Sequence, residues 1–379
     1  MYHLPDMSLQ PVGESLAQPG SREAWVRMLD SRPDRRIEYH PDMVLAATPA
    51  GATAMVYRDG PDVTALGALI PKRVRVVRAS YLGQALALSG YRLVADRVLG
   101  AESGSALDRF LAEAIELIDS GRADCLYFDD LEVGSEMWRA LEALERDGRA
   151  VRHLPSGTQT HWWIHFPEPP ADYWKKFSGK TRNTLRRKLK ALEHTVFKAT
   201  RPDDVAEFLR KASHISERSW QGRRIGLRIA ESEEERRYHQ LLAEHGALRS
   251  YVLDTPKGPV AFLRGIQTGD TYLYDEVGFD SEYAKLSPGT ILLHHALEDL
   301  TAHDPPRRLD FGVGDAQHKQ QFGNHTTESG PVVVVARRLR PRATLLVEQL
   351  RYGAEQRARA LLRRSGLYER MRRLYRGRS

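Results

Sequence analysis

The sequence contains a single cysteine, Cys125, among its 379 residues. One cysteine excludes an internal disulfide and any cysteine-rich metal site. Cys125 opens the apolar stretch 125–128, which is typical of a buried strand, and a thiol in such surroundings is unreactive. We therefore expect a structural cysteine in a protein of a reducing compartment, the cytoplasm.

Long hydrophobic runs are also missing. No window approaches the ~18 uninterrupted apolar residues of a membrane-spanning helix, and residues 1–20 lack the basic and apolar segments of a signal peptide. Apolar residues nevertheless make up 41% of the chain and charged residues 28%, the balance of a globular protein. The length favours two domains.

Acidic residues are scarce in two segments. Residues 336–379 contain 14 arginines, no lysine and three glutamates, a net charge of +11, so the rest of the chain carries 7 − 11 = −4. Residues 173–190 contain eight lysines and arginines and no acid. The tail fits an anionic membrane surface (over 340–379), nucleic acid, an acidic partner or a merely solvated helix face, and these alternatives remain open.

A proline cluster at 167–170 divides the sequence, because proline ends regular structure and stiffens linkers. In the first half, periodicity predicts helices at 106–118 and 135–146 and strands at 54–57, 63–70, 125–128 and 161–166. In the second half it predicts helices at 202–219, 231–245 and 287–301 and strands at 249–253, 260–267, 271–279, 308–311 and 331–337. We expect a flexible leader (1–20), two domains (21–168 and 169–338) and a basic helical tail (339–379).

Both halves follow one order of elements. Antiparallel hairpins come first, then a crossover helix and a further strand, which indicates a duplicated module. The sequence therefore predicts an α/β (α+β) fold with two tandem domains, each a mixed, mostly antiparallel sheet flanked by helices.

The most informative residues surround the helix at 287–301. Ser287 is placed to cap that helix, Pro288 has no amide hydrogen to leave unsatisfied, Gly289 exposes backbone and Thr290 adds a hydroxyl. Such a helix start favours an anion, although ordinary capped helices look the same. Before it stands Tyr-x-Tyr-Asp (272–275), and after it Asp-Phe-Gly-x-Gly-Asp-x-x-x-Lys (310–319).

These motifs, together with Ser-x-Lys-x-Arg-x-x-Leu-Arg-Arg at 178–187, resemble the CelD/BcsL branch of the GNAT superfamily of acyltransferases, which is related to the FemABX transferases. The resemblance covers about 165 residues and reaches the first half only as a pattern, which fits a degenerate GNAT-like domain. It implies a transferase that moves an acyl group, usually acetyl, from acyl-CoA to an amine or hydroxyl. In this branch the acceptor is a small molecule or a glycan or cell-envelope precursor, as in exopolysaccharide synthesis.

The resemblance assigns the donor site, and the positions of the remaining residues suggest the other roles. The start of the helix at Ser287, Gly289 and Thr290, with Tyr274, is expected to bind the donor. Asp275 or Asp310 is the expected general base, and Lys319 the expected stabiliser of the oxyanion. The expected acceptor-binding residues are Lys180, Arg182, Arg186 and Trp220. His318 is expected to be a surface or structural residue, and no His-x-Glu or Cys-x-x-Cys spacing is present to predict a metal.

Other interpretations of the sequence stay open. The Arg/Gln-x-x-Gly-x-Gly loop of ordinary GNAT enzymes is missing, and FemABX relatives use aminoacyl-tRNA, so tRNA is the alternative donor. A GNAT-like protein without catalysis, acting through its arginine-rich tail, is the third interpretation. We expect a cytoplasmic protein, with attachment to the inner face of the membrane as one outcome. The oligomeric state does not follow from the sequence.

Overall fold

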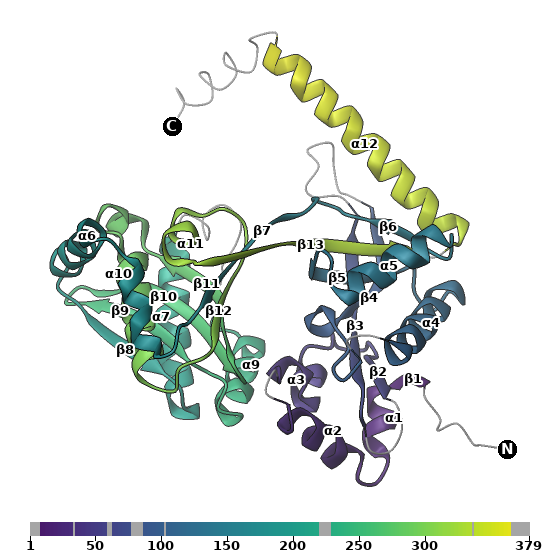
Figure 1. Ribbon diagram of the computed structural model, residues 1–379, viewed down its shortest axis with the longest axis horizontal. Helices are drawn as coiled ribbons and strands as arrows, with labels where there is room; N and C mark the ends of the chain where they lie inside the picture. Colours follow the sequence, from purple (N-terminus) through teal and green to yellow (C-terminus); the bar gives the residue numbers. More distant parts are fainter. Residues whose placement is uncertain are drawn as a thin grey trace. The chain divides into compact units, whose positions relative to one another are not determined.

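The computed structural model describes residues 8–32, 35–58, 63–76, 86–101, 104–219, 229–335 and 337–364. The chain divides into two compact units, whose elements are labelled in Figure 1. The first unit comprises Met1–Gln18, Thr48–Thr158 and Ser329–Ser379, and the second comprises Pro19–Ala47 and Gln159–Glu328.

These units differ from the predicted domains 21–168 and 169–338. The segment Pro19–Ala47 and strand β7 (Gln159–His165) belong to the second unit. Strand β13 (His325–Val335) passes into the first unit at Ser329. The hydrophobic pattern of a strand shows that the strand is buried but not which sheet it joins, so the sequence could not place these segments.

The predicted flexible leader is wrong for residues 8–17. Strand β1 (Ser8–Pro11) pairs antiparallel with β2 (Met55–Arg58), and helix α1 (Val12–Ala17) follows with Val12 buried. Strand β2 is distant from β1 in the sequence, so no local sequence pattern predicts that the two strands pair. Residues 1–7 lie outside the described residues.

The first unit is a sheet with helices packed on it. Its further elements are β3 (Leu66–Arg75), β4 (Ala87–Leu93), η2 (Val94–Asp96), α4 (Ser105–Asp119), β5 (Cys125–Glu132), α5 (Glu136–Arg146), β6 (Val151–His153) and α12 (Leu339–Arg364). Strands β2, β3 and β4 are antiparallel neighbours, α4 crosses over, and β5 pairs parallel with β4. Both predicted helices, the hairpin and the strand at 125 are confirmed.

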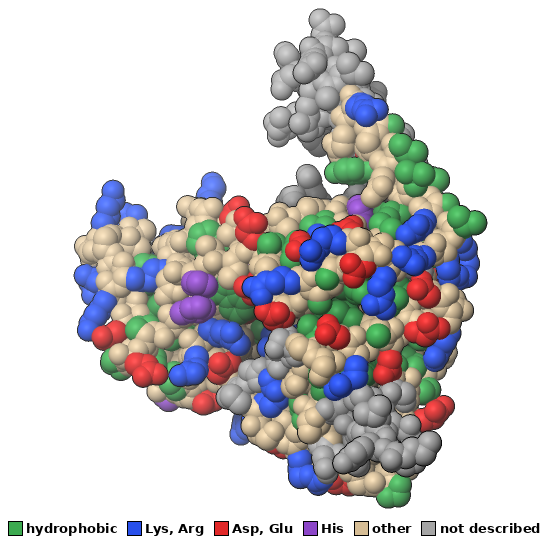
Figure 2. Space-filling model, turned by 45° about the vertical axis from the view of Figure 1, so that its right-hand side comes forward, with side chains coloured by type: hydrophobic (Ala, Val, Ile, Leu, Met, Phe, Trp, Pro, Cys, Tyr) green, Lys and Arg blue, Asp and Glu red, His purple; other side chains and the backbone are tan. Residues whose placement is uncertain are grey.

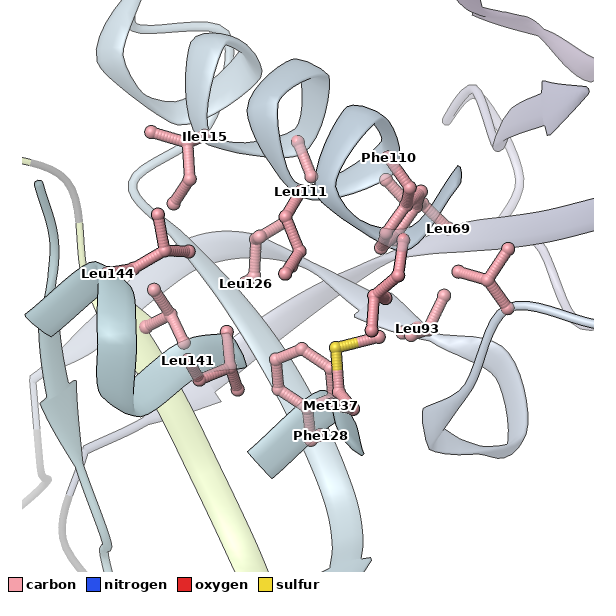
Figure 3. Packing of buried hydrophobic residues seen from close by; sticks show 14 of the residues in the cluster. Leu69, Leu93, Phe110, Leu111, Ile115, Leu126, Phe128, Met137, Leu141 and Leu144 are labelled. Carbon is pink, nitrogen blue, oxygen red and sulfur yellow. The ribbon is translucent and has the colours of Figure 1, made fainter. Parts of the chain in front are cut away.

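The core of this unit lies under α4. Figure 3 shows Phe110, Leu111 and Ile115 of α4 packed toward Leu126 and Phe128 of β5, all of them buried. The helix buries the face whose apolar residues recur every three or four positions. On β5, Cys125 is fully buried, and burial raises the pKa of its thiol to about 12, which confirms a structural cysteine.

The second unit repeats this arrangement on a larger scale. Its elements are α2 (Ser21–Asp30), η1 (Ile37–Tyr39), α3 (Pro41–Ala46), η3 (Pro170–Lys176), α6 (Gly179–Lys190), β8 (Thr195–Ala199), η4 (Pro202–Asp204), α7 (Val205–Arg218), α9 (Glu233–Glu244), β9 (Ser250–Thr255), β10 (Gly258–Thr268), β11 (Thr271–Phe279), η5 (Ser281–Leu286), α10 (Pro288–Ala302), β12 (Arg308–Val313) and α11 (Gln317–Phe322). Strands β8 to β11 are antiparallel, α10 crosses over, and β12 pairs parallel with β11. The duplicated order of elements is therefore present in both units.

Two hydrophobic clusters in this unit correspond to the two faces of its sheet. Helices α6 and α10 contribute to one cluster, and α7 and α9 contribute to the other. Helix α10 buries residues all along its length, from Pro288 to Leu300, which fixes the position of its first turn. Among the described residues, none of the helices combines the length and apolar character needed to cross a bilayer.

Candidate active site between strands β11 and β12

Strands β11 and β12 are paired over three residues only. The last pair joins Leu273 to Asp310, although β11 continues to Phe279 and β12 to Val313. At the same point, the pairing of β12 with β7 carries a bulge between Asp310 and Gly312. Bulges bend a strand and often accompany active sites. The paired ladder therefore ends at Asp310.

Three rings lie just beyond this point. Tyr274 of β11 meets Phe311 of β12 edge to face, with ring centroids 5.2 Å apart, and His318 of α11 lies 5.8 Å from Tyr274. Burial, helped by the charge of Lys319, lowers the pKa of His318 to about 4. Within the described structure, its Nε2 is buried and makes no hydrogen bond. His318 is therefore neutral at pH 7, with a nitrogen available to a ligand.

Asp310 is held by two donors. Its Oδ1 lies 2.5 Å from Nε2 of His161 and accepts the backbone N–H of Gly312 at 2.7 Å. Both side chains are largely buried, and the His161 ring stacks on Trp163 at 4.5 Å. Because a carboxylate only accepts, the proton of this contact belongs on Nε2 of His161. This is the carboxylate–imidazole geometry of a general base.

The site includes three residues that the sequence did not predict as site residues: Arg36, Glu38 and His161. Arg36 donates to Glu38 at 2.8 Å and interacts electrostatically with Asp310. Burial lowers the pKa of Arg36, but Glu38 outweighs burial and the pKa is raised overall, so the guanidinium stays charged. Arg36 and Glu38 belong to the segment Pro19–Ala47, which is part of the second unit. His161 appeared in the sequence only as a strand residue.

Asp275 lies in a different set of interactions. Its Oδ2 accepts from Nε of Arg264 at 2.5 Å, and Arg264 also pairs with Glu235 of α9. Burial raises the pKa of Tyr238, and the charges of Asp275 and Glu38 raise it further. Because Glu38 belongs to the Asp310 cluster through Arg36, Tyr238 lies between the Asp275 and Asp310 clusters. The carboxylate of Asp275 thus contacts an arginine, whereas that of Asp310 contacts a histidine. A role as general base for Asp275 or Asp310 stays a prediction.

Lys319 supports the loop after β12. Its ammonium donates to the carbonyl oxygens of Gly312 and Val313, at 3.2 and 2.6 Å. Gly312 and Gly314 have φ of +68° and +97°, conformations that strain any residue with a Cβ. The lysine therefore shapes this loop, and its role toward an oxyanion stays a prediction.

The predicted donor site is the start of α10. Ser287 has left-handed backbone (φ 56°), and the expected cap by its side chain is wrong, because its hydroxyl makes no capping bond. Its carbonyl oxygen instead accepts from the N–H groups of Thr290 and Ile291. Gly289 is close to Phe279, which a Cβ would approach to 3.8 Å. Donor binding by Ser287, Gly289, Thr290 and Tyr274 stays a prediction.

The predicted acceptor residues lie on α6. Ser178 caps this helix by accepting the N–H of Thr181, and Lys180, Arg182 and Arg186 are exposed. Arg182 donates to the carbonyl of Phe177 at 2.8 Å, so it also closes the turn before the helix. Trp220 lies outside the described residues.

Comparison with known proteins adds the family of the second unit. Residues 179–320 match the family model described as an acetyltransferase (GNAT) domain. The second unit thus contains a GNAT-like acetyltransferase domain. The match ends close to Lys319 and spans α6, β11, α10 and β12. It covers the helix start and the strand separation described above.

Solved structures resemble the chain over most of its length. FemX covers 86% of this chain and 98% of its own, with a TM-score of 0.59 and 13% identity. L-PGS from Bacillus licheniformis covers 88% of this chain and 96% of its own (TM-score 0.50, 14% identity). The C-terminal domain of a putative lysylphosphatidylglycerol synthetase from Agrobacterium fabrum covers 86% and 94% (TM-score 0.51, 11% identity). At these identities the likeness shows the fold. No curated protein matches the sequence.

Proposed function

We propose that the protein transfers an acyl group, in the first instance acetyl, from acyl-CoA to an amine or hydroxyl at the separation of β11 and β12. The end of strand pairing at Asp310, beside the His161–Asp310 pair, is the observation that carries this proposal. A donor acyl chain inserted there would meet the buried Nε2 of His318. The start of α10 would face the donor's phosphates.

In this proposal His161 is the general base. The acceptor amine or hydroxyl gives its proton to Nδ1 of His161 as it attacks the thioester carbonyl, and Asp310 stabilises the resulting imidazolium. Collapse of the tetrahedral intermediate breaks the carbon–sulfur bond and releases the thiolate. The acceptor class, a glycan or cell-envelope precursor, is carried by the sequence resemblance alone. In this proposal Lys180, Arg182 and Arg186, which are exposed on α6, hold its anionic groups.

Calorimetry with acetyl-CoA and longer acyl-CoAs tests the donor. We expect binding that Gly289→Trp abolishes and Gly13→Trp leaves intact, because Gly13 lies in α1 with open space beside it. His161→Gln and Asp310→Asn should bind the donor normally but lose about 100-fold or more in kcat for thioester cleavage with an amine acceptor. Folded protein that binds no acyl-CoA would refute the donor, and normal kcat in both variants would refute the base.

Aminoacyl-tRNA is the second candidate donor. The exposed basic residues of α6, within a segment that has no acid from 173 to 190, favour it. Binding of charged tRNA in place of acyl-CoA, weakened in Arg182→Gln/Arg186→Gln, would support this candidate. Binding of neither donor would leave a GNAT-like protein without catalysis.

We propose further that α12 attaches the protein to an anionic membrane surface. Figure 2 shows hydrophobic and basic side chains along this helix, and Leu339, Leu346 and Leu350 are 88%, 56% and 65% exposed. Both acids of 339–357, Glu348 and Glu355, are buried. An exposed face of leucine and arginine suits the surface of an anionic bilayer, where leucines insert among the acyl chains and arginines contact the headgroups. A nucleic-acid backbone offers the arginines phosphates but offers the leucines no apolar surface.

Vesicle co-sedimentation tests this attachment. The full chain should bind vesicles of phosphatidylglycerol and phosphatidylcholine, and binding should fall with Leu346→Ser/Leu350→Ser and with added salt. Leu45→Ser, a change to an exposed leucine outside α12, is the control. Equal binding by the double variant, or binding to RNA alone, would refute the proposal.

A further inference from the structure

Three side chains of α10 converge on one point away from the strand separation. His294 Nδ1 lies 3.3 Å from Oε2 of Glu298, and His295 Nδ1 lies 3.2 Å from the same oxygen. The side chains of His294, His295 and Glu298 are 13%, 30% and 52% exposed, so the cluster opens to solvent on the glutamate side. The ring of Trp174 covers His294 at 4.7 Å.

A neighbouring histidine fixes where the proton of His295 lies. Nδ1 of His194 is 2.6 Å from the carbonyl oxygen of Leu192, which can only accept, so this nitrogen carries the proton. In its neutral form the Nε2 of His194 is therefore an acceptor. It lies 2.9 Å from Nε2 of His295, which must then be the donor.

This relay leaves the inner nitrogen of His295 without a proton. In the neutral ring, Nδ1 of His295 is a bare lone pair, and it faces a carboxylate oxygen that is also electron-rich. Nδ1 of His294 is buried, makes no hydrogen bond among the described residues, and faces the same oxygen. Each Nδ1 thus lies 3.2 to 3.3 Å from one carboxylate oxygen, a contact that is favourable only when a cation, either a proton or a metal ion, lies between the two atoms.

We propose that His294, His295 and Glu298 bind a divalent transition-metal ion such as Zn²⁺, with His194 orienting His295 from behind. Imidazole nitrogen and carboxylate oxygen are the ligands that such ions take. Tetrahedral metal bonds of ~2.0–2.2 Å place neighbouring ligand atoms ~3.3–3.6 Å apart. The two Nδ1 atoms lie 3.3 and 3.2 Å from the carboxylate oxygen, and all three ligand atoms lie within 4.8 Å of one another. A histidine ligand whose other nitrogen is hydrogen-bonded is the usual arrangement. Three protein ligands leave a position open to water or to an anion.

A proton could occupy this cluster in place of a metal ion, and the two cations differ in the number of ligands that they need and in how their binding depends on pH. A proton needs only one acceptor and is displaced by raising the pH. A metal ion needs all three ligands and competes with protons for the imidazoles, so its affinity rises from pH 6 to pH 8. The motif His-His-x-x-Glu differs from the His-x-Glu and Cys-x-x-Cys spacings that predict a metal from sequence, and the cluster depends on His194, which is remote in sequence.

The test is calorimetric titration of Zn²⁺ into the full chain without a histidine tag, after treatment with a chelator, together with the visible spectrum of Co²⁺ as a probe of ligand geometry. We expect one ion per chain. His295→Ala and Glu298→Gln should abolish binding, and His194→Gln should weaken it about 10–100-fold. His303→Gln, a change to a histidine that is 74% exposed just beyond α10, should leave binding unchanged.

Circular dichroism and thermal melting show whether each variant is folded, so that loss of binding is assigned to the ligands. Binding that survives in both His295→Ala and Glu298→Gln would overturn the proposal. So would a folded wild-type protein that binds neither Zn²⁺ nor Co²⁺ at pH 8, because the cluster would then hold a proton only. The result of the metal titration does not depend on acyl-CoA binding, which tests the proposed donor site at the start of α10.

Discussion

Arg249 holds the C-terminal end of α10, and its removal is expected to destabilise the second unit. The arginine is 6% exposed, and its guanidinium donates to Oδ2 of Asp299 at 2.8 Å and to the hydroxyl of Tyr251. It also donates to the backbone carbonyls of Asp299, His303 and Asp304. These carbonyls lie in the last turn of α10 and just beyond it; that of Asp299 also accepts the N–H of His303, and that of Asp304 also accepts from Gln267.

The expected cost of Arg249→Met follows from these contacts. Breaking a buried ion pair costs about 3–5 kcal/mol. Asp299 is 20% exposed and keeps Lys198 and Tyr251 as partners, so we expect the lower end, about 3 kcal/mol. For a unit of this size about 3 kcal/mol corresponds to a fall in Tm of roughly 6–12 °C.

Urea and thermal denaturation followed by circular dichroism measure this loss. Arg249→Lys should fall between the wild type and Arg249→Met, because lysine keeps the charge but not the planar set of donors. Arg307→Met, at an exposed arginine nearby, is the control and should change stability by less than about 0.5 kcal/mol. A loss below about 1 kcal/mol in Arg249→Met would refute the argument that this arginine holds the helix.

Two further predictions concern the same unit. Gly265→Ala should destabilise the protein by about 1–3 kcal/mol or more, because the new Cβ would lie 1.8 Å from the buried hydroxyl of Tyr272. Gly179→Ala is the control and should not destabilise it, because Gly179 has open space beside it. A Gly265→Ala variant as stable as wild type would contradict the packing. Burial alone would raise the pKa of Asp299, but hydrogen bonds from Lys198, Tyr251 and Arg249 lower it to about 2. The stability that this carboxylate contributes is therefore complete above pH ~4 and lost as the pH falls through about 2, so urea midpoints should fall less steeply in Asp299→Asn than in wild type over that range. Equal pH dependence in the two proteins would contradict this assignment.

The sequence determined the elements and the order of the modules. Helix 106–118, the hairpin at 54–70 and the strands from 249 to 279 follow from hydrophobic periodicity and turn residues, because these signals are local. The resemblance carried by 272–275, 287–290 and 310–319 marked the second half as GNAT-like, and a family match over 179–320 supports that domain. It also marked Asp310, which the structure places at the end of the β11–β12 pairing.

Only the tertiary structure decided which distant residues meet. His161 reaches Asp310 because β7 pairs with β12, and Arg36 arrives from a segment that the sequence had assigned to the other domain. His194 meets His295 for the same reason, across a separation of 101 residues. Periodicity reports that a side chain is buried but not its partner, since the partner is set by strand order and by which faces the crossover helices cover. The sequence therefore specified the modules, and the fold assembled the candidate site from them.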